Sequence, residues 1–267
     1  MGFDIIVLAG QSNADGSGAG EVAVPYEQDE RILHMYDTQN IVEVLNGQSR
    51  RLFDIKPAEE RIYNGGRVGN FALSFAREYI KAGLLEDKRK VLILHTAVGG
   101  TGFASKQWGV GDVLQERLIA MTDKALGMEK PKIIAFLWHQ GEQDVVDNPE
   151  LDFEGRKSFY GQKLEEMISD FRVRYGHVPF LAGEFVDEWK KQHEEACNAI
   201  LAATKECCLR VGDAVVVSSK GLLSNNQKNG GGDTIHFCRQ ALYEYGQRYF
   251  KTYCSHFHNR CEGDFEV

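Results

Sequence analysis

The amino-acid sequence predicts an α/β fold, a three-layer α/β/α sandwich around a central, mostly parallel five-stranded sheet. Short β-branched runs alternate with longer segments of helical period along the chain, which is typical of parallel strands joined by right-handed helical crossovers. The strands are apolar along their whole length, as expected for a sheet covered on both faces. No repeat or change in composition divides the 267 residues. We expect a single domain over residues 1–267, with 254–267 as a loosely attached tail.

The predicted strands are short segments rich in valine, isoleucine and leucine. The first covers residues 3–9 (FDIIVLA) and ends at Gly10. A weaker strand is predicted at 32–36. The other strands are predicted at 90–96, 132–139, 178–182 and 214–218.

The predicted helices show apolar residues that recur with helical spacing. In residues 70–84, Phe71, Phe75 and Tyr79 stand at positions i, i+4 and i+8, which is typical of an amphipathic helix that packs one face against a sheet. The remaining helices are predicted at 112–126, 153–175, 188–208 and 238–253.

Charge and hydropathy exclude several classes of partner. Lys and Arg number 31 against 39 Asp and Glu, a formal net charge of −8, whereas binding to a phosphate backbone needs clustered basic residues. The longest apolar runs, such as 133–138, are far shorter than the roughly 20 residues that span a bilayer. We therefore expect no nucleic-acid partner and no membrane span. The first residues lack a basic region and a long apolar segment, so we expect a cytoplasmic protein or a secreted form whose leader was trimmed.

All six cysteines lie in the last third of the chain. Secreted disulfide scaffolds are short and evenly cross-linked, so we expect free thiols. One cluster near the end offers four zinc-type ligands, namely Cys254, His256, His258 and Cys261. Structural zinc sites usually take ligand pairs from two elements, whereas these four lie on one segment. We favour a polar tail with incidental thiols, and we expect no metal and no cofactor.

Polar motifs occur in four loops, three directly after predicted strands and one just before the last predicted helix. They are GQSN at 10–13, GGTG at 99–102, WHQGEQD at 138–144 and GGGDTIH at 230–236. In open α/β sheets, ligands bind outside the carboxyl ends of the strands. We therefore expect the four motifs to converge at one edge of the sheet.

These motifs contain the groups that acyl transfer needs, which are a nucleophile, a base, a group that orients the base, and donors for the oxyanion. Ser12 is the candidate nucleophile and His236 the candidate base. Asp233, three residues before His236, is the candidate orienting acid. The candidate oxyanion donors are the backbone N–H of Ser12, that of Gly99 or Gly100, and the side-chain amide of Gln140.

Several alternatives remain open from the residues alone. Glu142 is the competing acid for His236, Ser12 is also a suitable helix cap, and residues 99–102 form a candidate phosphate cradle that lacks the motifs of known phosphate loops. Weak candidates for substrate contact are Gln11, Asn13, Trp108 and His139. Four histidines without obvious companions are expected to be structural: His34, His95, His177 and His193.

The four motifs together resemble the successive blocks of the SGNH hydrolase superfamily. Glutamine in the first and third blocks is similar to the sialate O-acetylesterase-like branch, carbohydrate esterase family six, which includes acetylxylan esterases. The likeness covers most of the chain. Departures include ADGSG at 14–18, where the family often has MAGRG, and Asn70 where proline is common.

The resemblance implies an SGNH or flavodoxin-like fold and a serine esterase of Ser-His-Asp type. Its expected substrate is a small acetylated carbohydrate, of sialate or xylan type, or another ester. Two alternatives are an SGNH lipase- or thioesterase-like hydrolase of another small ester and a non-catalytic sugar-binding relative. Neither the natural acetylated substrate nor the oligomeric state follows from the sequence.

Overall fold

The computed structural model describes residues 1–48, 52–63 and 65–258. Its main sheet has seven strands in the order β3-β2-β6-β1-β7-β8-β9, and every neighbouring pair is parallel except β2 and β3. The strands of this sheet are β1 (Gly2–Gly10), β2 (Ile32–Asp37), β3 (Phe53–Pro57), β6 (Arg89–His95), β7 (Pro131–His139), β8 (Phe180–Gly183) and β9 (Ala214–Val217). A separate antiparallel hairpin consists of β4 (Arg61–Tyr63) and β5 (Gly66–Val68).

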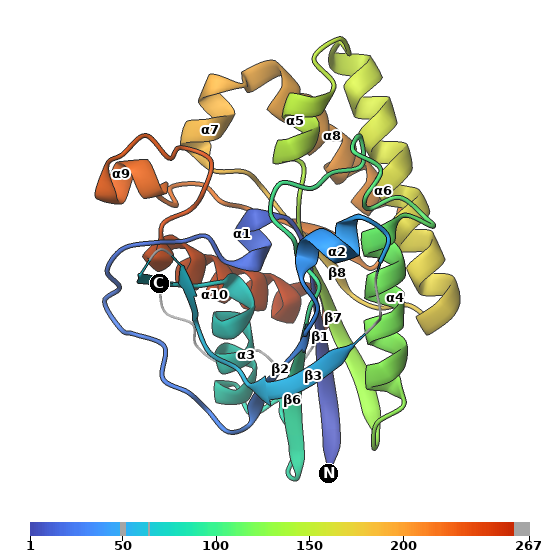
Figure 1. Cartoon of the computed structure of the whole chain (residues 1–267), viewed down its shortest axis with the longest axis vertical. Helices are drawn as coiled ribbons and strands as arrows, with labels where there is room; N and C mark the ends of the chain where they lie inside the picture. Colours follow the sequence, from blue (N-terminus) through green and yellow to red (C-terminus); the bar gives the residue numbers. More distant parts are fainter. Residues whose placement is uncertain (49–51, 64, 259–267) are drawn as a thin grey trace.

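Long helices cover both faces of the sheet (Figure 1). One face is covered by α3 (Phe71–Lys81) and α10 (Arg239–Phe257), which pack against each other. The other face is covered by α4 (Val113–Leu126), α6 (Phe153–Tyr175) and α8 (Glu194–Val211). Because β1 lies in the middle of the sheet, all nine of its residues are buried, and its side chains alternate between the two apolar cores.

Short helices gather over the carboxyl ends of the strands, at the end of the molecule opposite the N-terminus (Figure 1). They are α1 (Ser12–Asp15), α2 (Ile41–Leu45), α5 (Glu142–Asp147), α7 (Asp187–Gln192) and α9 (Asn225–Asn229). The loops between strands and helices at this end contain all four polar motifs, so the expected convergence at one sheet edge is observed.

The predicted α/β/α class is confirmed, but the sheet has seven strands rather than five, because the weaker strand predicted at 32–36 belongs to it as β2 and β3 is an additional strand. The strand β3 was missed because its sequence, FDIKP, is charged and half-exposed, as an antiparallel edge strand allows. The predicted helix at 188–208 is two helices, α7 and α8, which meet at His193 with φ −130° and ψ 45°. The first part, DEWKKQ, has a single apolar residue, Trp189, and is too short to show a helical period of its own, so the sequence pattern does not reveal the break.

Four described cysteines, Cys197, Cys207, Cys208 and Cys238, are free and buried. Burial raises the pKa of the Cys197, Cys207 and Cys208 thiols to about 12, so these thiols are unreactive near neutral pH. Cys254 is disulfide-bonded, and the expectation of free thiols is wrong for this residue.

The tail cluster lies partly outside the described residues. Cys254, His256 and His258 fall within them and Cys261 does not. Within the described ranges, no group of three or more His, Cys, Asp or Glu side chains is arranged to hold a metal ion. In the same part of the chain, no helix has the length and apolar character needed to cross a membrane.

Candidate active site

Ser12 owes its position to a sharp turn at the end of β1. Gly10 has φ +123°, and a Cβ there would overlap the carbonyl of His139 on the neighbouring strand β7. Only glycine tolerates this close approach. The next residue, Gln11, donates its backbone N–H to the same carbonyl at 2.9 Å. Ser12 therefore begins α1 directly above the sheet edge and lines a cleft of about 1130 Å³.

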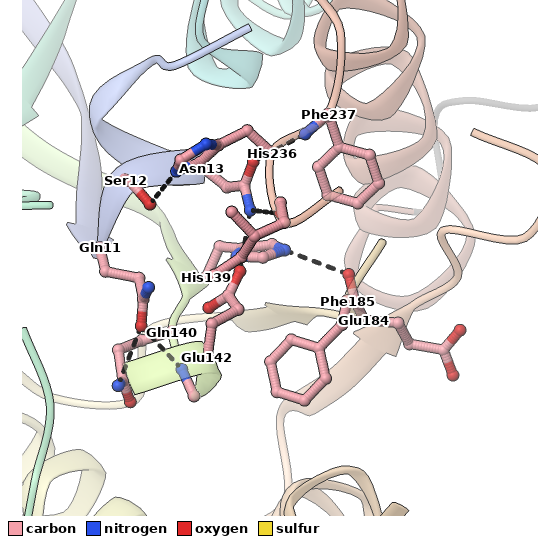
Figure 2. Close-up of polar contacts among 12 residues, drawn as sticks. Gln11, Ser12, Asn13, His139, Gln140, Glu142, Glu184, Phe185, His236 and Phe237 are labelled. Carbon is pink, nitrogen blue, oxygen red and sulfur yellow. Dashed lines mark hydrogen bonds and ion pairs between the residues drawn. The ribbon is translucent and has the colours of Figure 1, made fainter. Parts of the chain in front are cut away.

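The three residues expected to form a triad lie in one hydrogen-bonded chain. The Oγ of Ser12 is 2.8 Å from Nε2 of His236, and the pair is visible in Figure 2. Nδ1 of His236 lies 2.9 Å and 3.0 Å from the two carboxylate oxygens of Asp233. This is the arrangement in which a carboxylate fixes the imidazole tautomer and leaves Nε2 free to accept the serine proton.

Asp233 is held by the residues that precede it. Its Oδ2 accepts a hydrogen bond of 2.8 Å from Asn225 Nδ2, and its carbonyl accepts one of 2.8 Å from the Asn226 backbone. Burial raises the pKa of the Asp233 carboxyl, but hydrogen bonds from His236 and Asn225 and the charge of His236 outweigh it, and the net pKa is lowered. Asp233 is therefore ionised at neutral pH.

Asn13 fixes the backbone on both sides of His236. Its Nδ2 donates to the carbonyl of Ile235 at 3.1 Å, and its Oδ1 accepts from the N–H of Phe237 at 3.0 Å. The same Nδ2 donates to Oε1 of Glu142 at 2.8 Å. Asn13 has no exposed surface. It supports the loop that carries His236, and the expectation that it contacts substrate is not met.

Glu142 lies too deep to serve as the acid for His236. It has no exposed surface, and its Oε1 faces Asn13 Nδ2 and Nδ1 of His139, the latter at 3.3 Å (Figure 2). His139 is equally buried and its Nε2 bonds to the carbonyl of Glu184 at 3.1 Å. The geometry therefore favours Asp233 as the partner of His236, and His139 does not reach the cleft.

Three backbone N–H groups at the cleft are free to bind an oxyanion. Within the described residues, no acceptor is found for the N–H of Ser12, Gly99 or Gly100, and all three residues line the cleft. Gly100 has φ +68°, a left-handed conformation that glycine adopts readily. These are the three backbone groups named from the sequence as candidate oxyanion donors.

Gln140, in contrast, is not available as an oxyanion donor. Its Nε2 donates to the Thr101 carbonyl at 3.0 Å and to Asp144 Oδ2 at 2.7 Å, and the side chain is buried. These two hydrogen bonds connect loop 99–102 to α5. Gln140 therefore supports that loop, contrary to the expectation that its amide donates to the oxyanion.

Gln11 lines the cleft, as Gln143 does, although only 2% of Gln11 is exposed. Oε1 of Gln11 faces the backbone N–H of Gln143 at 3.0 Å. The same oxygen faces Nε2 of Gln140 at 3.3 Å (Figure 2). These donors determine which amide atom is the oxygen, because an oxygen must face them. In the described part of the chain, Gln11 Nε2 donates to no other group.

Trp108 has no exposed surface and donates from Nε1 to Thr101 Oγ1 at 2.9 Å. It packs edge-on against Trp138 with ring centroids 5.2 Å apart. The indole therefore supports loop 99–102 from beneath. The expectation that it lines a substrate pocket is not met.

A second polar cluster at the cleft, formed by Asp15, His95 and Arg61, was not predicted from the sequence. Asp15 is 3.0 Å from Nε2 of His95 and 2.6 Å from a guanidinium nitrogen of Arg61. His95, which was expected to be an isolated structural residue, is the last residue of β6, and its register partner on β1 is Leu8. The parallel pairing of β1 with β6 is the only signal that would bring His95 near Asp15, and it requires knowledge of the strand order.

Comparisons with known proteins agree with this geometry. A family model described as "Carbohydrate esterase, sialic acid-specific acetylesterase" matches residues 2–255. An Arabidopsis thaliana protein named "Probable carbohydrate esterase" is 25% identical over 188 residues, which are 67% of this chain and 61% of the relative. The matched segment thus spans less than two thirds of that relative's length.

Two solved structures share the fold. That of the same Arabidopsis thaliana protein has a TM-score of 0.67 at 21% identity, covering 95% of this chain and 98% of the other. The crystal structure of NanS has a TM-score of 0.72 at 18% identity, covering 95% and 97%. The resemblance to the sialate O-acetylesterase-like branch is thereby confirmed, and the chain belongs to the carbohydrate esterase family of sialic acid-specific acetylesterases.

Proposed function

We propose that this protein is a serine O-acetylesterase that removes acetyl groups from hydroxyls of a carbohydrate of sialate or xylan type. The observation that carries the proposal is the chain of hydrogen bonds from Ser12 Oγ through His236 to Asp233. Membership of a carbohydrate esterase family supports the ester and sugar parts of the substrate. The triad alone does not define the leaving group, because one arrangement serves many hydrolases.

In this reaction Ser12 Oγ attacks the acetyl carbonyl carbon while His236 Nε2 takes the serine proton. Asp233 stabilises the imidazolium that results. The tetrahedral intermediate collapses with cleavage of the bond to the sugar oxygen, which receives the proton from His236. Water then attacks the acetyl-serine, again losing a proton to His236, and acetate is released with Ser12 regenerated.

The negative charge that develops on the acetyl oxygen needs donors that are already in place. The N–H groups of Ser12, Gly99 and Gly100 line the cleft without an acceptor within the described residues. We assign Gln11 Nε2, rather than Gln140, as the side-chain donor, since Gln11 lines the cleft and Gln140 is fully engaged beneath it. One such donor typically contributes about 3–4 kcal/mol to lowering the barrier.

The proposal is tested by treating the purified chain with a serine-directed fluorophosphonate and mapping the modified residue by mass spectrometry. Labelling of Ser12, and loss of labelling in Ser12→Ala, is expected. Hydrolysis of p-nitrophenyl acetate, O-acetylated sialic acid and acetylated xylo-oligosaccharides is measured in parallel. Unchanged turnover in Ser12→Ala would remove the esterase assignment, and a preference for long acyl esters would favour the lipase-like alternative.

A further inference from the structure

A second cavity opens beside the cleft, and the proposed chemistry does not use it. It has a volume of about 590 Å³ and lies between β2, α2, the β4–β5 hairpin and the carboxyl end of β6. We call it the side cavity. The lining residues that matter here are Asp15, His34, Arg61, Arg67, His95 and Gly99.

The side cavity is continuous with the cleft that holds the nucleophile. Asp15, Arg61, Arg67 and Gly99 line both. Gly99 is in direct contact with the nucleophile's residue, because a Cβ at Gly99 would lie 3.4 Å from Ser12 Cβ. A molecule whose ester group is attacked by Ser12 can therefore extend past Gly99 into the side cavity.

The wall nearest the cleft contains an ionised carboxylate. Burial raises the pKa of Asp15, but the hydrogen bond and charge of His95 and the charge of Arg61 outweigh it and lower the pKa overall. Asp15 uses one oxygen for His95 at 3.0 Å and the other for Arg61 at 2.6 Å. A polar and charged surface of this kind binds groups that both donate and accept hydrogen bonds.

A buried histidine in the side cavity lacks a partner. His34 is 4% exposed, and its Nε2 has no hydrogen-bond partner in the described part of the chain. Its ring packs edge-on against that of His95, with centroids 5.6 Å apart. Buried polar atoms are nearly always paired, and the wall of the side cavity formed by His34 thus contains an imidazole nitrogen that lacks a partner in the described part of the chain.

Arg67, on β5, lies at the junction of the cleft and the side cavity. It is exposed and lines both. No ion pair or hydrogen bond of its side chain is found among residues 1–48, 52–63 and 65–258, whereas neighbouring Arg61 is paired with Asp15. The five donors of a guanidinium remain available for a ligand there.

We propose that the side cavity binds the sugar that carries the acetyl group, with His95 and Arg67 as its polar contacts. This inference rests on the proposed function, whose acetyl group it places at Ser12. The volume is within the range of about 300–1,000 Å³ common for small-ligand pockets. Sugar hydroxyls donate and accept hydrogen bonds, whereas an acyl chain here would desolvate the polar wall without replacing its hydrogen bonds.

The test compares two substrates in the purified full chain. For wild type, Arg67→Ala and His95→Phe, kcat/KM is measured for an acetylated sugar (O-acetylated sialic acid or an acetylated xylo-oligosaccharide) and for p-nitrophenyl acetate. The quantity compared is the ratio of the first kcat/KM to the second. We expect the ratio to fall at least ten-fold in both variants, mainly through KM for the sugar ester. Matched controls are Arg174→Ala and His177→Phe, on exposed residues remote from the cavity, which should leave the ratio within two-fold of wild type.

An unchanged ratio in Arg67→Ala, whose side chain is exposed, would overturn the inference. The inference would also be overturned if Arg67→Ala and His95→Phe both changed the preference between p-nitrophenyl acetate and p-nitrophenyl octanoate. The side cavity would then hold the acyl chain.

Binding separates this inference from the proposed function. N-acetylneuraminic acid and xylobiose are titrated calorimetrically into Ser12→Ala, which has no nucleophile. At least one of the two sugars should bind to Ser12→Ala. The affinity for that sugar should fall at least ten-fold in the double variant that also carries Arg67→Ala. Such binding without hydrolysis of any ester by wild type would refute the esterase and keep the sugar site. Hydrolysis with sugar binding that is insensitive to Arg67 and His95 would refute the sugar site alone.

Discussion

The side-chain amide of Asn13 donates a hydrogen bond of 2.8 Å to the carboxylate of Glu142, and neither residue has exposed surface. Because Asn13 also bonds the backbone on both sides of His236, the buried Glu142 on α5 orients the side chain that holds the proposed general base. Glu142 therefore acts on the proposed reaction through position, without touching the substrate.

Glu142→Ala should lower kcat for p-nitrophenyl acetate by about 10- to 100-fold, since a displacement of about 1 Å at a catalytic group can cost about 100-fold in rate. KM should change less than two-fold. Rates are normalised to folded sites by titration with a fluorophosphonate, so that loss of folded protein is not counted. Glu142→Gln, which keeps an oxygen for Asn13, should recover much of kcat, and Val146→Ala on the exposed side of α5 should be silent. Equal damage by the Ala and Gln variants would contradict the positioning role.

Asp233→Asn should reduce kcat by about 10⁴-fold, because an amide donor facing Nδ1 selects the wrong imidazole tautomer. The fold should persist, since Asn keeps a side-chain oxygen that can accept from Asn225. Stopped-flow or steady-state rates on p-nitrophenyl acetate give the loss, and circular dichroism monitors the fold. Glu142→Gln serves as the comparison, and a larger loss there than in Asp233→Asn would reverse the assignment of the acid.

Asp233 should add no protonation step to the acid limb of the pH–rate profile. The pKa of Asp233 is lowered in the folded chain, so its carboxylate remains ionised throughout that limb. For the same reason, Asp233 stabilises the fold at pH values above its unfolded pKa of about 3.9, and this contribution is lost as pH falls through the lower folded pKa. A limb with a slope of two in log(kcat/KM) between pH 4 and 6 would contradict this prediction.

Gln11→Glu should lower kcat by about 10²- to 10³-fold with little change in KM, the usual loss for one oxyanion donor. Glutamate keeps the oxygens that accept from the backbone of Gln143 but lacks the N–H donors. The matched control is Gln143→Glu, which adds the same charge to the cleft wall while its amide already donates to Asp147 at 2.6 Å. Similar losses in both variants would assign the effect to charge, and Gln11 would then not be a donor.

Gly246→Ala should destabilise the protein by about 1–3 kcal/mol, the usual cost of overpacking. On α10, a Cβ at residue 246 would overlap the carbonyl oxygen of Phe71 on α3. Gly161→Ala on α6 is the matched change, because its Cβ would be at an ordinary 3.5 Å from Ala203 Cβ, and helix propensity then favours alanine by up to about 1 kcal/mol. Urea unfolding measures both, and equal effects would contradict close packing of α3 on α10.

The sequence predicts those parts of the structure that depend on local pattern. Strands 3–9 and 132–139 and the helix at 153–175 were recognisable because each buries a continuous apolar run or stripe. Placing Ser12, Asp233 and His236 at one sheet edge followed from parallel strand order. The edge strand β3 has no such pattern, because one face and one edge of it meet solvent.

Side-chain direction was not predictable, because it depends on tertiary packing. Gln11 and Gln140 are both glutamines beside a glycine after a strand, yet one lines the cleft and the other bonds to Thr101 and Asp144 beneath it. Likewise, Trp108 follows a glycine-rich loop and could equally face a ligand or the core. Trp108 lies in the core because its ring packs against Trp138 beneath that loop, and this contact is not visible in the sequence.

The 224 positions that separate Ser12 from His236 also have a consequence for biosynthesis. A ribosome adds residues from the N-terminus onward, and domains generally acquire structure as units during synthesis. The Ser12 hydroxyl is made before the imidazole of His236, which is translated only after all nine described strands. Under the proposed function, a nascent chain that stops before residue 236 lacks the base, and ester hydrolysis requires synthesis through that residue.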